Sequence, residues 1–348
     1  MLLKKKVCLA ILLFCILVIV IVTHTMQKGS ILPVAVVASV WLHESSRPNQ
    51  TQTLFSAASK PSAPVLTPKR ACSCSSCVAE RGASDWFDER FDHEQQPYLK
   101  SVDDSIDPLS LKWWLALQRS EKIRIENVLE KMFQVISTPS DDVAEPERCR
   151  RCAVVGNSGN LRGSKYGAAI DTHDFIIRMN KATTANFEAD VGNRTTHHLM
   201  YPESAVDLDP GVHLVLLPFK LRDLQWVASA LSTGEVKMTY MRVKDFIKAD
   251  KNKVIVVNPA FFKYTHDHWN EQHGRYPSTG MLAIIFALHM CDQVSVFGYG
   301  ADPLGNWHHY WENNQHAGAF RKTGVHHADF EMTVISKLHK VGKIKFHR

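Results

Sequence analysis

Histidines and carboxylates lie close together near the end of the chain, in the stretch "TGVHHADFE". His326 and His327 are adjacent, and Asp329 and Glu331 follow shortly after them. Imidazole transfers protons near neutral pH because its ordinary pKa is about 6.5, but it can also bind a metal or cap a helix. A zinc site would need a third and a fourth ligand, and the spacing differs from H-E-x-x-H. These residues therefore favour proton transfer over a metal site.

Two further polar stretches follow predicted buried strands. "AVVGNSGNL" enters a turn at Gly156 and Asn157, and "QVSVFGYG" ends at Gly300 before a loop that carries His309 and Glu312. Loops after strand ends often hold the chemistry of α/β proteins. Glycines let a backbone approach a phosphate, but the spacing differs from G-x-G-x-x-G, so an ordinary dinucleotide site is disfavoured. A plain strand-to-helix turn is the alternative for the first stretch.

A fourth candidate stretch opens a hydrophobic helix. The stretch "YPSTGMLAIIFALHM" places Ser278, Thr279 and Gly280 at the start of that helix. Ser or Thr at this position caps a helix, and the N–H groups of the first turn can hold a phosphate or carboxylate. Taken alone, the stretch predicts capping.

The elements that must position these residues alternate along the chain. "CAVVG", "DFIIRMN", "HLVLLPF", "KVIVVNP" and "QVSVFGYG" are short apolar runs typical of buried strands. "LRDLQWVASALSTG" and "STGMLAIIFALHM" are helical stretches between them, and "DPLSLKWWLALQ" and "EKIRIENVLEKMFQVI" indicate two earlier helices. Strands that alternate with helices predict an α/β fold with a mostly parallel sheet, whose ligands bind at the carboxyl ends of its strands.

The N-terminus carries an uncharged apolar run at residues 7–22, directly after Lys4, Lys5 and Lys6. The run is close to the roughly 20 residues that span a bilayer, and the lysines keep their side cytoplasmic. The next residues show no clean cleavage site, which favours an anchor over a cleaved signal peptide. We expect a cytoplasmic tail at 1–6, a transmembrane anchor at 7–23, a flexible Ser-, Thr- and Pro-rich stem at 24–71 and a folded lumenal domain at 72–348.

The net charge of the chain bears on the kind of partner that it binds. The 348-residue chain has a formal charge of +6 without a dense basic stripe, so we expect no nucleic-acid partner.

Besides Cys8 and Cys15 there are six cysteines, and an even number in a lumenal domain indicates disulfides. "CSCSSC" and "CRRC" have zinc-like spacing, which an oxidising lumen disfavours. The residues alone leave fifteen pairings open. Sequons at Asn49 and Asn193 fit the same compartment.

Taken together, four of these stretches resemble the motifs of the animal sialyltransferases, glycosyltransferase family 29, in the right order. "CRRCAVVGNSGNLRGSKYG" and its continuation resemble the large motif, and "NPAFFKYTHDHWNEQHGRYPSTGMLAIIFALHMCD" resembles the small motif. "HYWE" resembles the third motif and "HHADFE" the H-x-x-x-x-E very small motif. The resemblance runs from about Cys72 to the C-terminus. It is strongest with the β-galactoside α-2,3-sialyltransferases of types 1 and 2, and "GASDWFD" and "NPAFFKY" favour type 2.

The resemblance implies a single-pass type II Golgi membrane enzyme with a Rossmann-like sheet of the GT-A variant class. Such an enzyme would transfer sialic acid from CMP-sialic acid to the 3-hydroxyl of the terminal galactose in Galβ1-3GalNAc, on O-glycans and on glycolipids such as gangliosides. It would invert the anomeric centre and need no metal or other cofactor. His326 would be the general base, and His309 would donate a hydrogen bond to the departing phosphate.

The resemblance also implies binding residues and disulfides. Gln118 and Tyr276 would contact the acceptor. The disulfides would be Cys72–Cys77, Cys74–Cys149 and Cys152–Cys291. Relatives usually carry Asp at the position of His327. The donor would be held by residues of the large, small and third motifs and by one tyrosine between them: Asn157, Asn180, Tyr240, Ser278, Thr279, Gly280, Gly300 and His309.

Several alternatives stay open. Other β-galactosides such as Galβ1-4GlcNAc are alternative acceptors, and the sequence ranks neither glycoprotein against glycolipid nor one oligomeric state against another. A homo-oligomer and a secreted form released by cleavage of the stem are both compatible with it. A lumenal zinc hydrolase and a membrane-anchored glycan-binding protein without catalysis are the competing classes, and the histidines at 309 and 326 argue against the second.

Overall fold

The structure is a computed structural model that describes residues 71–118, 124–139, 147–302, 304–313 and 324–348. The expected tail and anchor and all but the last residue of the expected stem lie outside these ranges, as do Cys8, Cys15 and the Asn49 sequon. No helix in the described ranges is long and apolar enough to cross a membrane. The described part begins one residue before Cys72 and contains every predicted site residue.

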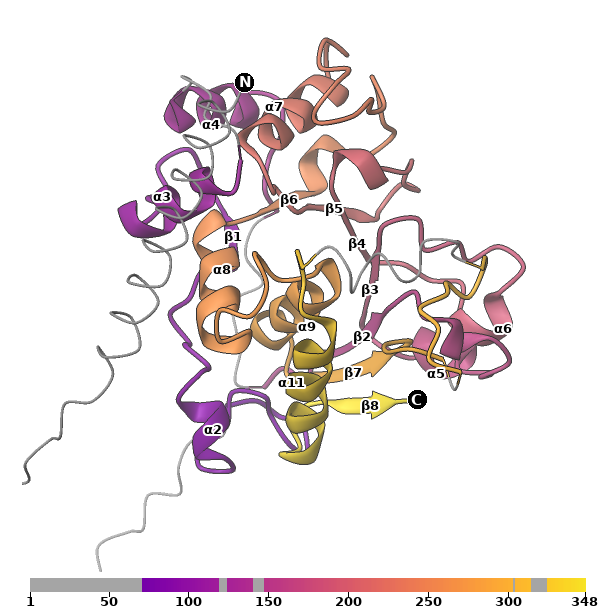
Figure 1. The fold of residues 1–348 in the computed structure, drawn as a ribbon. Helices are drawn as coiled ribbons and strands as arrows, with labels where there is room; N and C mark the ends of the chain where they lie inside the picture. Colours follow the sequence, from indigo (N-terminus) through magenta and orange to yellow (C-terminus); the bar gives the residue numbers. More distant parts are fainter. Residues whose placement is uncertain (1–70, 119–123, 140–146, 303, 314–323) are drawn as a thin grey trace, which may run out of the picture. The chain divides into compact units, whose positions relative to one another are not determined.

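A single mixed sheet organises the described residues (Figure 1). Its strand order is β1-β6-β5-β4-β3-β2-β7-β8. Neighbouring strands run parallel, with one exception, because β1 pairs with β6 in the antiparallel sense. The predicted mostly parallel α/β sheet is therefore confirmed. The strands are β1 (Tyr98–Leu99), β2 (Arg151–Val155), β3 (Phe175–Met179), β4 (His197–Met200), β5 (His213–Leu216), β6 (Val254–Val257), β7 (Gln293–Phe297) and β8 (Lys345–His347).

Helices cover both faces of this sheet, so the side chains on both faces of its strands are buried. In β2, Cys152 and Val154 join one apolar cluster, and Ala153 and Val155 join another on the opposite face. Such double burial explains why the strands read as continuous apolar runs. The helices are α2 (Asp85–Asp88), α3 (Pro108–Ala116), α4 (Ile125–Phe133), α5 (Gly167–Asp171), α6 (Glu188–Val191), α7 (Leu221–Ala230), α8 (Pro259–Tyr264), α9 (Thr279–Met290) and α11 (Ala328–Lys340).

The two faces carry different helices. On one face α8, α9 and α11 share a cluster with β2, β3 and β7, and α9 is apolar all round because it lies between the sheet and the other helices. On the opposite face α4 and α7 pack together over β5 and β6, while α5 and α6 cover β2 and β3. The short elements between them are η1 (Gly159–Leu161), η2 (Pro202–Ser204), η3 (Lys251–Lys253) and the single π-helical turn η4 (Thr265–Trp269).

The chain changes direction across the sheet between β2 and β7. From β2 it proceeds through β3, β4, β5 and β6 on one side, then returns to place β7 on the other side of β2. Open parallel sheets bind ligands at such a switch point, outside the carboxyl ends of the two strands. Here those ends lead into Gly156 and Gly298, so the topology brings together two of the four stretches that the sequence singled out.

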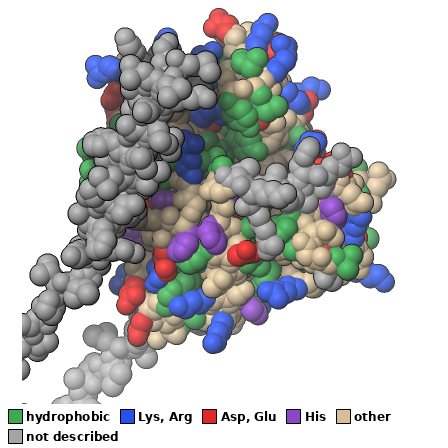
Figure 2. Space-filling model, in the orientation of Figure 1, with side chains coloured by type: hydrophobic (Ala, Val, Ile, Leu, Met, Phe, Trp, Pro, Cys, Tyr) green, Lys and Arg blue, Asp and Glu red, His purple; other side chains and the backbone are tan. Residues whose placement is uncertain are grey.

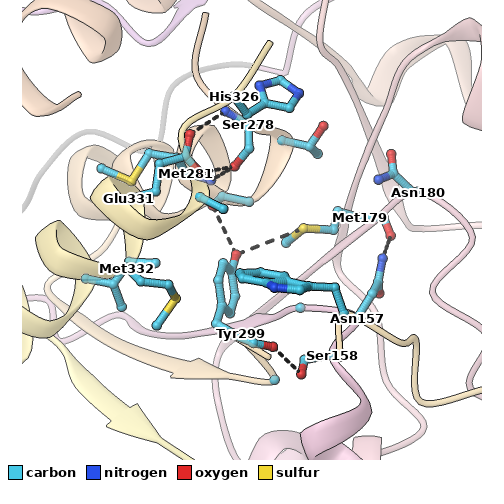
Figure 3. A pocket seen from close by; sticks show the side chains of 18 of the residues that line it. Asn157, Ser158, Met179, Asn180, Ser278, Met281, Tyr299, His326, Glu331 and Met332 are labelled. Atoms are coloured by element: carbon cyan, nitrogen blue, oxygen red, sulfur yellow. Dashed lines mark hydrogen bonds between the residues drawn. The ribbon is translucent and has the colours of Figure 1, made fainter. Parts of the chain in front are cut away.

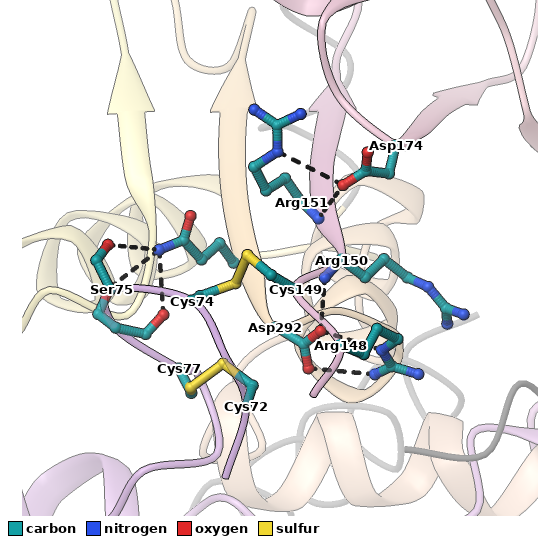
Figure 4. The surroundings of a disulfide bond; sticks show 12 residues. Cys72, Cys74, Ser75, Cys77, Arg148, Cys149, Arg150, Arg151, Asp174 and Asp292 are labelled. Atoms are coloured by element: carbon teal, nitrogen blue, oxygen red, sulfur yellow. Dashed lines mark hydrogen bonds and ion pairs between the residues drawn. A yellow bond between two sulfur atoms is a disulfide. The ribbon is translucent and has the colours of Figure 1, made fainter. Parts of the chain in front are cut away.

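The described residues contain three disulfides, one that closes a short N-terminal loop and two that join distant parts of the chain. The structure contains Cys72–Cys77, Cys74–Cys149 and Cys152–Cys291, the same three pairs that the resemblance implied. Figure 4 shows the first two beside Arg148, whose guanidinium pairs with Asp292 at 3.1 Å. Cys152–Cys291 joins β2 to the C-terminal end of α9, across 139 residues of sequence. A bond across so many residues removes much conformational freedom from the unfolded chain.

Candidate active site

A cavity of about 370 Å³ opens at the switch point between β2 and β7. Figure 3 shows side chains from the β2 loop, the β7 loop, the start of α9 and the α11 region converging on it. In the space-filling view this side of the molecule is hollowed, and histidine side chains gather beside the hollow (Figure 2). The predicted site residues in its wall are Asn157, Asn180, Ser278, Thr279, Gly280, Gly300, His309 and His326.

The Tyr299 ring lies between Gly156 of the β2 loop and Gly280 of α9 and explains why both positions are glycine. A Cβ on Gly156 would lie 2.3 Å from the carbonyl oxygen of Gly298 and 2.9 Å from the ring of Tyr299. A Cβ on Gly280 would also meet that ring at 2.9 Å. The Tyr299 hydroxyl donates to the Gly280 carbonyl at 3.0 Å, and burial raises the pKa of this phenol. These glycines are thus required by packing against Tyr299, which the sequence did not predict.

Two asparagines present buried amide oxygens at the cavity. The Nδ2 group of Asn157 donates to the Met179 carbonyl at 3.1 Å. The Oδ1 atoms of Asn157 and Asn180 are buried and have no hydrogen-bond partner among the described residues. Asn180 has a left-handed backbone with a φ of 59°, and its carbonyl accepts from the imidazole of His198 at 2.6 Å. Because a buried, unpaired amide oxygen is costly, both atoms are suited to accept hydrogen bonds from a hydroxyl or amine of a bound ligand.

The N-terminus of α9 faces the cavity, and Ser278, one of the two residues predicted to cap it, is its N-cap. The Ser278 hydroxyl accepts from the N–H of Met281 at 3.1 Å and donates to Glu331 at 2.5 Å. The Ser278 N–H also donates to Glu331, at 2.8 Å, so the side chain of this serine is fully engaged in structure. The first turn of α9, from Thr279 onward, carries the positive end of the helix dipole, which favours an anionic ligand.

His326 lies just before α11 in a fixed tautomer. Its Nδ1 lies 3.0 Å from the carbonyl oxygen of Tyr276, and a carbonyl can only accept, so Nδ1 carries the proton and Nε2 carries the lone pair. The Tyr276 ring packs edge-on against the imidazole with 5.1 Å between centroids. This arrangement equips His326 to take a proton at Nε2.

His309 enters the cavity from the β7 loop. Its Nδ1 lies 3.0 Å from a carboxylate oxygen of Glu312, and its ring stacks on Trp311 at 4.5 Å. A short antiparallel bridge to Ser158 ties the backbone of His309 to the β2 loop. The hydrogen bond to His309 is the main cause that lowers the pKa of Glu312, so this carboxylate is ionised and orients the imidazole through Nδ1–H. When both ring nitrogens carry a proton, Nε2–H of His309 can donate a hydrogen bond to an anion.

His327 has a different task from that of its neighbour. It does not appear among the residues that line the cavity, and its Nδ1 accepts from the N–H of Phe330 at 3.2 Å as the N-cap of α11. The carbonyl of His327 accepts from the N–H of Glu331 at 3.0 Å. The two adjacent histidines are therefore one cavity residue and one helix cap. Among the described residues there is no group of three or more His, Cys, Asp or Glu side chains that could hold a metal ion.

The three remaining predicted residues lie outside the cavity wall formed by the described residues. Tyr276 contacts His326, as given above. Gln118 accepts from the N–H of Leu221 at 2.6 Å, at the start of α7. Tyr240 is 69% exposed, and the Lys220 ammonium lies 4.9 Å from the centroid of its ring. Tyr201, which the sequence did not single out, lines the cavity on the side of these residues.

Comparison with known proteins identifies the class that this fold and site define. Residues 100–343 match the sequence model of glycosyltransferase family 29 (sialyltransferase). The chain belongs to this family, and it is therefore a glycosyltransferase. The resemblance found in the motifs is confirmed.

Individual relatives cover most of the chain. The rat protein named CMP-N-acetylneuraminate-beta-galactosamide-alpha-2,3-sialyltransferase 2 is 56% identical over 283 residues, which are 80% of this chain and 80% of the relative. The human protein named CMP-N-acetylneuraminate-beta-galactosamide-alpha-2,3-sialyltransferase 1 is 51% identical over 283 residues, which are 80% of this chain and 83% of the relative. A solved mammalian sialyltransferase superposes with a TM-score of 0.74 at 48% identity, over 80% of this chain and 99% of that one. A second solved structure, of a mammalian sialyltransferase in complex with Gal-beta-1-3GalNAc-ortho-nitrophenol, has a TM-score of 0.74 at 48% identity, over 79% of this chain and 98% of that one.

Proposed function

We propose that this protein transfers N-acetylneuraminic acid from CMP-sialic acid to the 3-hydroxyl of the terminal galactose in Galβ1-3GalNAc, on glycoproteins and glycolipids. The names of the type 1 and type 2 relatives support the α-2,3 linkage and a β-galactosamide acceptor. The solved relative that binds a Galβ1-3GalNAc derivative supports the disaccharide. The observation that carries the proposal is the hydrogen bond from His326 Nδ1 to the Tyr276 carbonyl, which leaves Nε2 as the basic nitrogen. His326 and His309 line the same cavity.

The reaction is a single displacement at the anomeric carbon of sialic acid. His326 Nε2 takes the proton from the galactose 3-hydroxyl while that oxygen bonds to the anomeric carbon. The bond between the anomeric carbon and the phosphate oxygen breaks on the opposite side, its electron pair leaves with CMP, and the configuration inverts. His309, held by Glu312, donates a hydrogen bond to the departing phosphate.

The donor would lie between the β2 loop and the start of α9. The phosphate would face the first turn of α9 near Thr279 and Gly280, where the helix dipole favours negative charge. The Oδ1 atoms of Asn157 and Asn180 would accept from ribose hydroxyls. Ser278 would contribute through the position of α9, because its hydroxyl and its N–H are both engaged with Glu331. Gly300 would lie beside the nucleoside.

We also propose catalysis without a metal. A nucleoside monophosphate leaving group has less charge to neutralise than a diphosphate. A helix N-terminus and an imidazole donor can supply the stabilisation that a divalent cation gives elsewhere. The catalytic domain would begin near Cys72 and lie in the Golgi lumen, anchored by residues 7–23 through the stem. Three disulfides in the described part suit that oxidising compartment.

Detergent-solubilised full-length protein tests the proposal directly. It would be incubated with CMP-sialic acid and a panel of Galβ1-3GalNAc, Galβ1-4GlcNAc and other β-galactosides, with EDTA or with manganese, followed by linkage analysis of the product. We expect α-2,3-linked sialic acid on Galβ1-3GalNAc at equal rates with and without EDTA. Preferred transfer to Galβ1-4GlcNAc would correct the acceptor, and strict dependence on manganese would refute metal-free catalysis. Glycan binding without release of CMP would favour a non-catalytic protein.

A further inference from the structure

A buried ion cluster of Lys220, Glu203 and Asp223 lies beside Tyr240. The Lys220 ammonium is 3.0 Å from a carboxylate oxygen of Glu203 and 2.8 Å from one of Asp223. The side chain of Glu203 is 4% exposed and that of Asp223 is 0% exposed, while Lys220 keeps 19% exposure. Two carboxylates therefore share one ammonium in the interior of the protein.

Burying such a cluster contributes little to the stability of a fold, because the charges lose their hydration. Removing charges from water opposes folding unless every atom is paired, and the second carboxylate oxygen of Glu203 has no hydrogen-bond partner among the described residues. Burial raises the pKa of Asp223 to about 7 even though Lys220 opposes this shift. Apolar side chains of similar size would serve stability at least as well. The position of the charges thus calls for a role beyond stability.

On its outer side the cluster holds a short hairpin. The Lys220 ammonium faces the Tyr240 ring at 4.9 Å from its centroid, and the hydroxyl of the preceding Thr239 donates to Glu203. The hairpin is closed by an antiparallel bridge between Met238 and Arg242. Because Tyr240 is 69% exposed, the Lys220 contact and the Thr239 hydrogen bond help to fix the orientation of its ring.

On its inner side the same cluster orients the aromatic residues next to His326. The Asp223 carboxylate accepts from the N–H groups of Phe219 at 2.9 Å and Lys220 at 3.1 Å. The Phe219 ring packs against Tyr276 with 5.3 Å between centroids, and Tyr276 in turn packs against His326. One ion cluster therefore connects the exposed Tyr240 to the ring that contacts the proposed base.

We propose that Lys220 is a positioning residue for the acceptor. With Glu203 and Asp223, it fixes Tyr240 relative to the Phe219–Tyr276 pair, so that an acceptor sugar held between these rings presents its reacting hydroxyl to His326. The proposal rests on the proposed function, because it assumes that the sugar acceptor binds on this side of the cavity. Lys220 does not touch the reacting atoms or the cavity residues that would hold the donor. Tyr240, which the resemblance placed with the donor, lies outside the cavity wall formed by the described residues, and we assign it to the acceptor side. Donor binding should therefore not depend on Lys220.

Steady-state kinetics of full-length variants test this role. Lys220→Met removes the ammonium at nearly constant length, Lys220→Arg keeps a cation, and Lys244→Met is a matched control because Lys244 makes an exposed ion pair with Asp207 at 3.2 Å. The KM for Galβ1-3GalNAc, the KM for CMP-sialic acid and the slow release of CMP to water without acceptor would be measured for each. We expect Lys220→Met to raise the acceptor KM about tenfold and leave the other two quantities unchanged, with Lys220→Arg and Lys244→Met close to wild type.

A milder variant covers the case in which Lys220→Met does not fold. Thr239→Val keeps every charge and removes only the hydrogen bond from the hairpin to Glu203, so it should raise the acceptor KM severalfold with donor KM unchanged. An unchanged acceptor KM in the folded variants, or an equal rise of both KM values, would overturn the role of Lys220 while wild-type transfer leaves the proposed function intact. Wild-type protein that transfers sialic acid to no galactoside would refute the proposed function, and this role with it.

Discussion

Glu331 accepts two hydrogen bonds from Ser278, one from its N–H at 2.8 Å and one from its hydroxyl at 2.5 Å. The same carboxylate accepts from the side-chain amide of Asn270 at 3.1 Å. Glu331 lies in α11, five residues after His326, and Ser278 begins α9. The glutamate therefore joins the helix that follows the proposed base to the helix whose N-terminus faces the proposed donor phosphate. Its role is to hold two parts of the site together.

Glu331→Gln should destabilise the protein and misplace His326. The new amide would turn N–H groups toward donors that now share a carboxylate, so we expect a loss of about 1–3 kcal/mol in the free energy of unfolding. Urea unfolding measures this loss. Glu126→Gln is a suitable control because Glu126 is exposed on α4 and should leave stability unchanged. An unaltered midpoint for Glu331→Gln would show that the link is not needed.

His327 should contribute to stability and not to catalysis. It caps α11 through an imidazole nitrogen that accepts the N–H of Phe330, and aspartate, which relatives carry here by resemblance, is also a good cap. His327→Asp should keep stability, and His327→Ala should lower it by about 1 kcal/mol with kcat nearly unchanged. Thermal unfolding and kcat measured together decide the matter. If His327→Ala reduced kcat as strongly as changes at His326, the division of roles between the two histidines would be wrong.

Glu312 should support the leaving-group step through His309. Glu312→Gln keeps the size of the side chain but removes the carboxylate that orients the imidazole. We expect kcat to fall about tenfold with little change in acceptor KM. The effect should be smaller than the roughly 100-fold loss typical when a positioned proton donor is removed, because His309 itself remains. Steady-state kinetics with saturating donor measure it. A change confined to acceptor KM would show that Glu312 supports acceptor binding and not the departure of CMP.

Buried His197 should make the protein less stable in acid. Burial, followed by the effects of His213 and Arg150, lowers its pKa from 6.5 to about 3. A histidine with a lowered folded-state pKa binds its proton more readily when unfolded, so stability is lost as pH falls from about 6.5 toward 3. This group should remove about 1 kcal/mol between pH 7 and pH 5.5.

His197→Phe should flatten that part of the stability curve, because it removes the titrating group and keeps an aromatic ring against Phe175. Urea unfolding at several pH values measures the effect, with the exposed His268 replaced by Gln as a control. Identical slopes for wild type and His197→Phe would show that His197 does not carry this part of the acid sensitivity.

The sequence predicted the parts of the fold that have regular patterns. The β-branched runs at β2, β3, β5, β6 and β7 are strands, and Ser278 caps α9. The strand β4 was not predicted because half of its four residues are histidines, which are buried here against residues of neighbouring strands such as Phe175 and His213. Strands β1 and β8 are too short for a periodic pattern.

Several site contacts depend on residues far apart in the chain. Glu331 meets Ser278 across 53 residues, and Lys220 meets Glu203 across 17. In the sequence Lys220 and Asp223 look like ordinary charges at a helix start, and nothing marks Glu203 as their partner. Tyr299 carries no local signal either, because the reason for its position is its fit between Gly156 and Gly280. These relationships are set by the sheet topology, which places separate loops at one switch point.

The replacement of His326 by asparagine is the most direct test of the proposed mechanism. Asparagine can keep a donor toward the Tyr276 carbonyl, but it lacks the basic nitrogen that corresponds to Nε2. With CMP-sialic acid and Galβ1-3GalNAc, we predict that His326→Asn lowers kcat by roughly 100-fold or more while its unfolding midpoint stays close to wild type. Near-normal kcat in this folded variant would contradict the assignment of His326 as the general base.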